Sequence, residues 1–74
     1  MKAIITLRNF ENEIKITCFS QNWNDLEDRV CEVEDNVNNG KPLFDRYKSV
    51  ETKYYDNEGF EYDIYLKERV LEIV

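Results

Sequence analysis

Residues 22–37 read NWNDLEDRVCEVEDNV and decide the fold, because they contain the clearest helical pattern in the chain. Apolar side chains recur at intervals of three and four residues, which puts them on one face of a helix: Trp23, Leu26, Val30, Val33 and Val37. Three residues before or within the first turn have side-chain oxygens that could cap the helix by accepting hydrogen bonds from its free backbone N–H groups: Ser20, Asn22 and Asn24. The sequence NNG at 38–40, with Pro42 beyond it, predicts where the helix ends.

Residues 2–19, before this helix, alternate between apolar and polar side chains, as a β-hairpin does. The apolar positions fall on one face of each expected strand: Ala3, Ile5 and Leu7 in the first, and Ile14, Ile16 and Cys18 in the second. The polar sequence NFEN at 9–12 predicts the turn. Because Arg8, Lys15 and Thr17 point the other way, we expect a sheet that is covered on one side only.

Residues 49–67, after the helix, predict a second hairpin around the turn DNEG at 56–59. If Asp56 and Phe60 close this turn, three pairs of residues lie opposite each other on one face: Val50 with Leu66, Thr52 with Ile64, and Tyr54 with Tyr62. Lys53 and Asp63 then form an opposite-charge pair on the other face. The regular pairing favours this register.

The order of elements predicts a single α+β domain over residues 1–74 with a hairpin–helix–hairpin (ββαββ) arrangement. Its antiparallel sheet would be covered on one face by the one amphipathic helix. Two segments stay open. Residues 41–49 could form an extra strand or a helical turn, and residues 68–74 could extend the last strand or form one helical turn.

The chain has 74 residues and a net charge of −6. This length suits one small domain, for which a homodimer or a tight partner would be a natural supplement to a modest core. An acidic chain repels nucleic acid and anionic membranes, so we expect basic proteins as partners and no direct binding to nucleic acid or membrane. The apolar run at 3–7 is too short for a signal peptide or a membrane span, which favours a cytoplasmic location.

The residue types argue against catalysis and against a bound metal or cofactor. Cys18 and Cys31 form no C-x-x-C motif, and without histidine the chain has no ordinary zinc ligand set, so we expect two reduced, partly buried thiols. The missing histidine also removes the commonest general base near neutral pH. Carboxylate pairs could act instead, but sixteen acids cannot be sorted into catalytic pairs from sequence. We therefore expect a protein that is not an enzyme.

The polar side of the helix is the most unusual surface that the sequence predicts. Four acids line the side opposite the apolar stripe and span about 15 Å: Asp25, Asp28, Glu32 and Asp35. We call them the acidic ridge; Glu27 and Glu34 flank it, and Arg29 is the only base in the helix. Regularly spaced carboxylates can stand in for the phosphates that a basic groove binds. The alternative is a solvated helix face that keeps a small acidic protein soluble.

A second candidate surface is the tyrosine-rich hairpin near the C-terminus. Tyr54 and Tyr62 should point inwards, whereas Tyr55 and Tyr65 should point outwards and could contact a protein, with Glu61 and Asp63 beside them. These tyrosines could equally reflect strand propensity alone. Stacking on nucleic-acid bases is a third option, supported by the nearby Lys41, Arg46, Lys48 and Lys53, but the neighbouring acids argue against it.

A short acidic domain with a carboxylate-lined helix and no catalytic motif resembles the small anti-defence proteins of phages and mobile elements, such as anti-CRISPR proteins and DNA mimics. The resemblance implies inhibition of a basic nucleic-acid-binding protein or complex by occupation of its groove. We therefore predict a binding protein that inhibits or regulates such a partner through the ridge. The alternative prediction is a homodimeric accessory protein, or a toxin-neutralising module, that docks through the tyrosine-rich hairpin.

Overall fold

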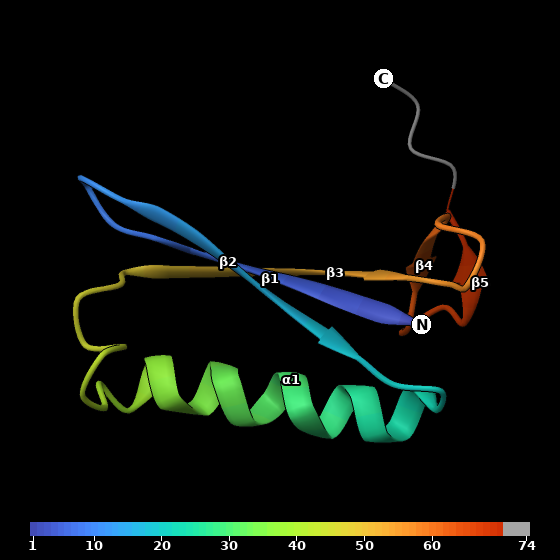
Figure 1. Cartoon of the computed structure of the whole chain (residues 1–74), viewed down its shortest axis with the longest axis horizontal. Coiled ribbons are helices and arrows are strands. Elements are labelled where there is room, and N and C mark those ends of the chain that lie inside the picture. The colour runs from blue at the N-terminus through green and yellow to red at the C-terminus, as the bar shows by residue number, and fades with distance from the viewer. Residues whose placement is uncertain (71–74) are drawn as a thin grey trace.

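The computed structural model describes residues 1–70 and shows an α+β fold in two layers, a five-stranded antiparallel sheet with one helix on one face (Figure 1). The order of strands across the sheet is β2-β1-β3-β4-β5. The elements follow one another along the chain as β1 (Lys2–Arg8), β2 (Glu13–Phe19), α1 (Trp23–Asn38), β3 (Ser49–Tyr55), β4 (Glu61–Asp63) and β5 (Glu68–Arg69). The predicted α+β class is confirmed, but the described residues form a ββαβββ arrangement, not ββαββ.

Strand β1 is the centre of the fold, because it pairs along its whole length with β2 on one side and β3 on the other. Its alternate side chains Ala3, Ile5 and Leu7 are completely buried against α1. The matching residues of the neighbouring strands, Ile16 and Val50, pack against the same cluster and are partly buried. The register puts the predicted apolar residues of both strands on this face, as expected, but Ile14 at the start of β2 is 40% exposed instead of packed in the core.

Helix α1 has the ends that its sequence predicts. Of the three candidate caps, Asn22 is the one used: its side-chain oxygen accepts the backbone N–H groups of Asn24 and Asp25 at 2.8 and 3.3 Å. At the other end Gly40 has a positive φ of 63°, and the amides of Gly40 and Lys41 donate to carbonyls of the last turn. This is a Schellman arrangement, in which a glycine takes the left-handed position.

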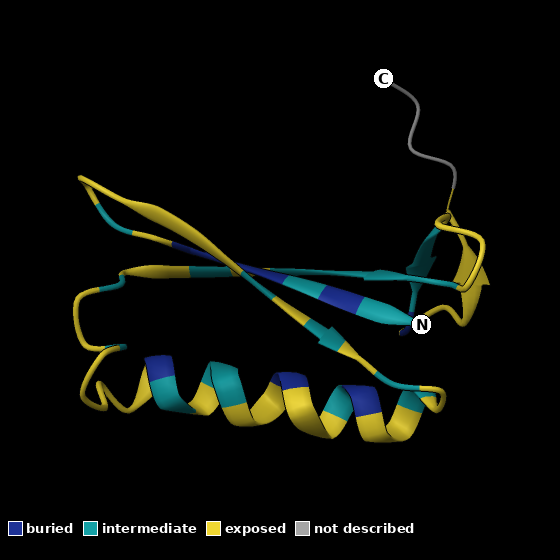
Figure 2. Cartoon of the chain, in the orientation of Figure 1, coloured by how far each residue is buried: buried dark blue, intermediate teal, exposed yellow. Residues whose placement is uncertain are grey.

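The apolar stripe of α1 faces the sheet and carries most of its buried surface. Leu26, Val30 and Val37 are buried, while Trp23 and Val33 pack at the edge of the same cluster. In Figure 2 the buried residues line the side of α1 turned towards the sheet, and exposed residues fill the other side. The helix therefore has one face fixed by the core and one face fully open to solvent.

The first hairpin closes as predicted, and one arginine ties three strands together on the far face of the sheet. The side chain of Asn9 accepts the amides of Glu11 and Asn12 in the turn. Arg8 donates to Glu13 of β2 at 3.1 Å and to Glu51 of β3 at 2.9 Å. These hydrogen bonds raise the pKa of Arg8 and lower that of Glu51.

The second hairpin begins as predicted but ends earlier. The amide of Asp56 donates to Phe60, and Gly59 takes a positive φ of 88°, so the turn and the Tyr54–Tyr62 pair are confirmed. Strand β4, however, stops at Asp63. The predicted pairs beyond it are therefore wrong: Val50 with Leu66 and Thr52 with Ile64.

The early end of β4 has a local cause. The carboxylate of Asp63 accepts the amides of Tyr65 and Leu66 at 2.9 and 3.1 Å, and Lys67 has a φ of 54°. An aspartate that bonds to amides two and three residues ahead favours a turn over a continuing strand. The chain reverses, β5 pairs back onto β4, and Leu66 lies at the surface instead of against Val50.

The two segments that the sequence left open are settled only in part. Residues 42–46 form turns, not a strand, and Phe44 from this connector packs against the core. Glu68 and Arg69 form the short strand β5, so no helical turn forms there. The expectation for residues 71–74 lies outside the described residues.

We predict that Leu26→Ala lowers the free energy of unfolding by about 2–5 kcal/mol, because Leu26 is fully buried between α1 and β1. This is a large share of the roughly 4–11 kcal/mol expected for a chain of this size. Urea denaturation followed by circular dichroism measures the change. Glu32→Ala, on the exposed side of the same helix, serves as the control and should shift the stability by less than about 0.5 kcal/mol. Equal effects of the two substitutions would contradict this placement of the core.

Candidate functional site: the outer face of the helix and its surroundings

The structure brings the four residues of the acidic ridge together on one surface. They are all exposed and lie on the side of α1 turned away from the sheet: Asp25, Asp28, Glu32 and Asp35. Within residues 1–70 no ion pair joins Asp28, Glu32 or Asp35 to a base. The outer face of the helix is therefore a row of solvated carboxylates.

Asp25 differs from the other residues of the ridge because local contacts hold it. Its carboxylate accepts a hydrogen bond from the Ser20 hydroxyl at 2.7 Å and pairs with Arg29, one helical turn later, at 3.1 Å. The Ser20 hydrogen bond, followed by the Arg29 contact, lowers the pKa of Asp25. Asp25 therefore helps to order the start of α1, and the freely available charge of the ridge lies on the other three acids.

The flanking acids Glu27 and Glu34 lie on the side of α1 that faces β3, and both are partly buried. Glu34 accepts a hydrogen bond from the Thr52 hydroxyl at 2.8 Å. Tyr54 lies in the same region, where burial and then the charges of Glu34 and Glu27 raise its pKa to about 12. These two acids thus contribute to the contact between helix and sheet, in contrast to the ridge.

Trp23, at the first turn of α1, is the centre of an aromatic cluster. Its ring stacks on Tyr62 with centroids 4.4 Å apart and meets Tyr54 edge-on at 6.4 Å. Tyr54 and Tyr62 therefore point towards the helix, as predicted. Tyr65 is 90% exposed and lines the same shallow groove as Glu27 and Trp23, so this tyrosine and one flanking acid do share a surface.

Of the remaining predicted site residues, Glu61 and Asp63 line a second pocket with Tyr65, whereas Tyr55 does not join them. Tyr55 lies on the opposite face of the sheet, where the Lys2 ammonium group sits 5.6 Å from the centre of its ring. Glu61 pairs with Tyr55 in the β3–β4 ladder, and Asp63 is occupied by the turn that ends β4. The predicted tyrosine surface is therefore divided between two faces of the molecule.

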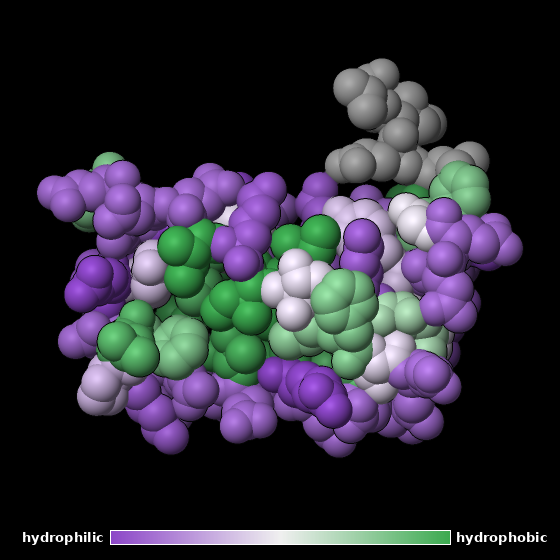
Figure 3. Space-filling view, viewed as in Figure 1, coloured by the Kyte–Doolittle hydropathy of each residue, from purple (hydrophilic) through white to green (hydrophobic). Residues whose placement is uncertain are grey.

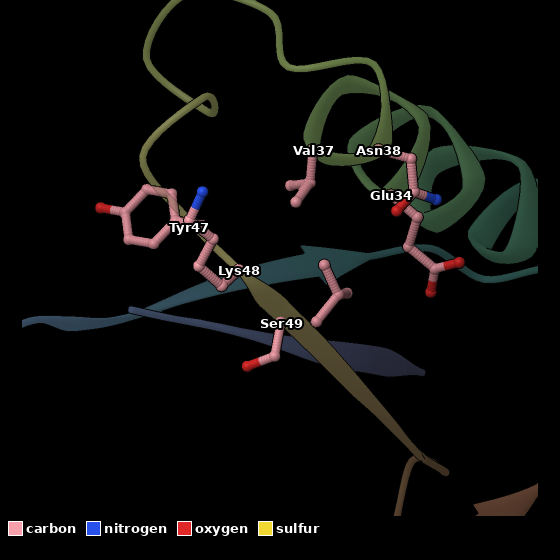
Figure 4. Close-up of a pocket in the computed structure, with 7 residues that line it drawn as sticks. Glu34, Val37, Asn38, Tyr47, Lys48 and Ser49 are labelled. Carbon is pink, nitrogen blue, oxygen red and sulfur yellow. The ribbon is translucent and has the colours of Figure 1, made fainter. Parts of the chain in front are cut away.

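An open groove of about 500 Å³ lies between the end of α1 and the start of β3. Its lining includes Val37 and Asn38 from the helix and Tyr47 and Lys48 from the connector, and Figure 4 shows Val37 pointing from the helix towards the sheet. Glu34 and Lys48 supply one charge of each sign to its lining. Such a polar, shallow opening lacks the enclosed apolar walls of an ordinary small-molecule site.

The sheet face opposite α1 carries a feature that sequence reasoning missed. Bases gather there from three strands: Lys2 and Arg8 from β1, Lys15 from β2, and Lys53 from β3. Acids lie there too: Glu13 and Glu51 bind Arg8, and Glu61 and Asp63 lie near Lys53. We call this the open face; it carries bases and acids together, whereas the outer side of the helix is acidic. The sequence signal that could have predicted this face is the charged residue at alternate positions of β1, β2 and β3.

The structure also places the two thiols. Cys18 is partly buried, as predicted, whereas Cys31 is exposed, so the prediction for Cys31 is wrong; both are free. Partial desolvation, together with the acids around it, raises the pKa of Cys31, which favours the less reactive thiol form. Among residues 1–70 no group of histidine, cysteine or acidic side chains is arranged to hold a metal ion. No helix in this part of the chain has the length and apolar character needed to cross a membrane.

The raised pKa of Tyr54 gives a prediction for alkaline solution. Below its ordinary value of 10 the phenol is neutral in the folded and unfolded states, so stability is unaffected. Between 10 and about 12 only the unfolded state ionises, and the free energy of unfolding should fall. The phenolate absorbance should contain a component near pH 12 that Tyr54→Phe removes. An unchanged titration in this nearly isosteric variant would show that Tyr54 is not the group held neutral.

The similarity of this chain to known proteins was tested in three ways. No protein-family model matches it, and neither a curated protein nor a solved structure matches it. Function must therefore be inferred from the residues and their geometry.

Proposed function

We propose that this chain is a binding protein that inhibits or regulates a basic, nucleic-acid-binding protein or complex, by presenting the acidic ridge in place of phosphates. The observation that carries the proposal is the exposure of Asp28, Glu32 and Asp35 along one side of α1, with no base bonded to them within residues 1–70. Carboxylates without internal partners are available to an external one.

The helix supports this role by its rigidity. Its inner stripe is fixed in the core, and the cap at Asn22 and the glycine end at Gly40 fix its length. On such a scaffold the backbone needs no ordering on binding, which favours affinity. Anions at a regular spacing attract the cationic groove that a nucleic-acid-binding protein offers to phosphates.

The alternative function, docking through the tyrosine-rich hairpin, has weaker support. It needs Tyr55 and Tyr65 to act together, and they lie on opposite sides of the sheet. Only Tyr65, with Trp23 and Glu27 beside it, offers an exposed aromatic contact near the helix. That groove could extend the contact made by the ridge rather than form a separate interface.

The test is capture from nuclease-treated bacterial lysate on three immobilised baits. One bait is the wild-type chain, and the second carries Asp28→Asn, Glu32→Gln and Asp35→Asn, which remove charge while nearly keeping shape. Asp25 is left intact because it orders the helix start. A partner bound by the ridge should lose roughly 3- to 150-fold in affinity on the second bait. It should also be released as salt rises from about 0.05 to 0.5 M.

The third bait controls for net charge, because it loses the same number of acids at exposed positions elsewhere: Glu11→Gln, Asp45→Asn and Glu68→Gln. It should bind the partner as the wild type does. Added double-stranded DNA or RNA should displace the captured partner, since both compete for one groove. Equal loss on the two variant baits, or no displacement by either nucleic acid, would contradict phosphate mimicry.

A further inference from the structure

Strand β2 forms a long free edge of the sheet, in contrast to the other edge. The strand has seven residues, whereas β5 at the opposite edge has two. Proteins usually protect an edge by shortness, proline, a bulge or a covering element. Residues 13–19 contain no proline or glycine and pair with β1 without interruption. Lys15 is the only basic residue along this edge.

The direction of the free backbone groups follows from the pairing with β1. At the two ends of this ladder, Ser20 donates to Met1 and Asn9 donates to Asn12. Hydrogen-bonded and non-bonded pairs alternate in an antiparallel ladder, so the even-numbered residues of β2 direct their N–H and C=O groups towards β1. The odd-numbered residues direct theirs outwards, and these are Glu13, Lys15, Thr17 and Phe19.

An apolar band runs beside this edge. In Figure 3 hydrophobic colour reaches the surface between the sheet and α1. Ile14 at this edge is 40% exposed, and Ile16, Cys18 and Val33 are only partly covered by the core. Phe19, at the end of the strand and on the open face, is 67% exposed. A partner that adds a strand to β2 would cover backbone groups and apolar side chains at once.

We propose that β2 pairs antiparallel with β2 of a second copy of this chain, which joins the two sheets across a two-fold axis at Ile16. In this register each of the seven residues of β2 has a partner in β2 of the other copy. It places Ile16 against its own copy and Ile14 against Cys18. It also places Glu13 against Phe19 and Lys15 against Thr17, with the outward backbone groups meeting in hydrogen-bonded pairs.

The extent of pairing selects this register, and the charges along the strand are compatible with it. With the axis at Ile16, no like charges lie opposite each other, because Lys15 meets Thr17 and Glu13 meets Phe19. With the axis one residue earlier, Lys15 would face its own copy, and like charges directly opposite are destabilising. The two helices then lie on the same face of the joined sheet. This association uses β2 and not the ridge, so it is independent of the proposed function.

Two substitutions at Thr17, which is exposed and lies on the open face, test the register by the sign of their effects. Thr17→Glu should create two opposite-charge pairs with Lys15 of the other copy, and Thr17→Lys should create two repulsive ones. Sedimentation equilibrium between about 10 µM and 1 mM, a range suited to a small interface, measures the dimer dissociation constant. We expect it to fall about 2- to 30-fold for Thr17→Glu and to rise similarly for Thr17→Lys.

Net charge alone predicts the opposite order, because Thr17→Glu makes the acidic chain more acidic and Thr17→Lys makes it less so. A third variant, Thr17→Pro, removes an amide that points away from β1, so it should abolish the dimer and leave the circular dichroism of the monomer intact. Wild-type protein that stays monomeric throughout the range would overturn the proposal. So would a dimer that Thr17→Lys strengthens as much as Thr17→Glu does.

Discussion

The fold depends on the complete burial of one face of β1. Ala3, Ile5 and Leu7 are closed off by α1, and β2 and β3 satisfy both backbone edges of the strand. Because the single helix is needed to cover this strand, its other side has nothing to pack against within residues 1–70. The same constraint leaves β2 at the edge of the sheet and the open face in solvent. The acidic ridge, the free edge and the open face are thus consequences of one arrangement, the burial of one face of β1 under α1.

A second contact, made by the first residue of the helix stripe, joins α1 to the β3–β4 end of the sheet. Trp23 stacks on Tyr62 and meets Tyr54, so the start of α1 holds the β3–β4 end of the sheet. The protein measures 33 × 29 × 18 Å, and Figure 1, viewed down the shortest axis, shows the sheet and α1 side by side across that axis. In such a small molecule, most side chains outside the central cluster reach the surface. Charged side chains at the surface can therefore serve contacts with other molecules without weakening the packing of the core.

The sequence predicted those features that local patterns determine. The stripe of α1, its cap at Asn22, its glycine end and the turn at 56–60 all depend on residues a few positions apart. The exposure of the ridge followed from the same helical period. The central place of β1 and the separation of Tyr55 from Tyr65 depend on pairings between distant segments, which periodicity does not reveal. The end of β4 was missed because Asp63 bonds to the amides ahead of it, and a strand pattern hides that competition.

The two proposed contacts should respond to salt in opposite directions. A basic partner on the ridge is held by attraction between exposed charges, which salt screens, so that contact weakens as salt rises. Two copies joined through β2 bring two chains of net charge −6 together, and screening reduces their repulsion. The ridge lies on the side of α1 away from the sheet, so pairing at β2 leaves it uncovered. A dimer would therefore present two acidic rows on one face, which doubles the sites available to an extended basic partner.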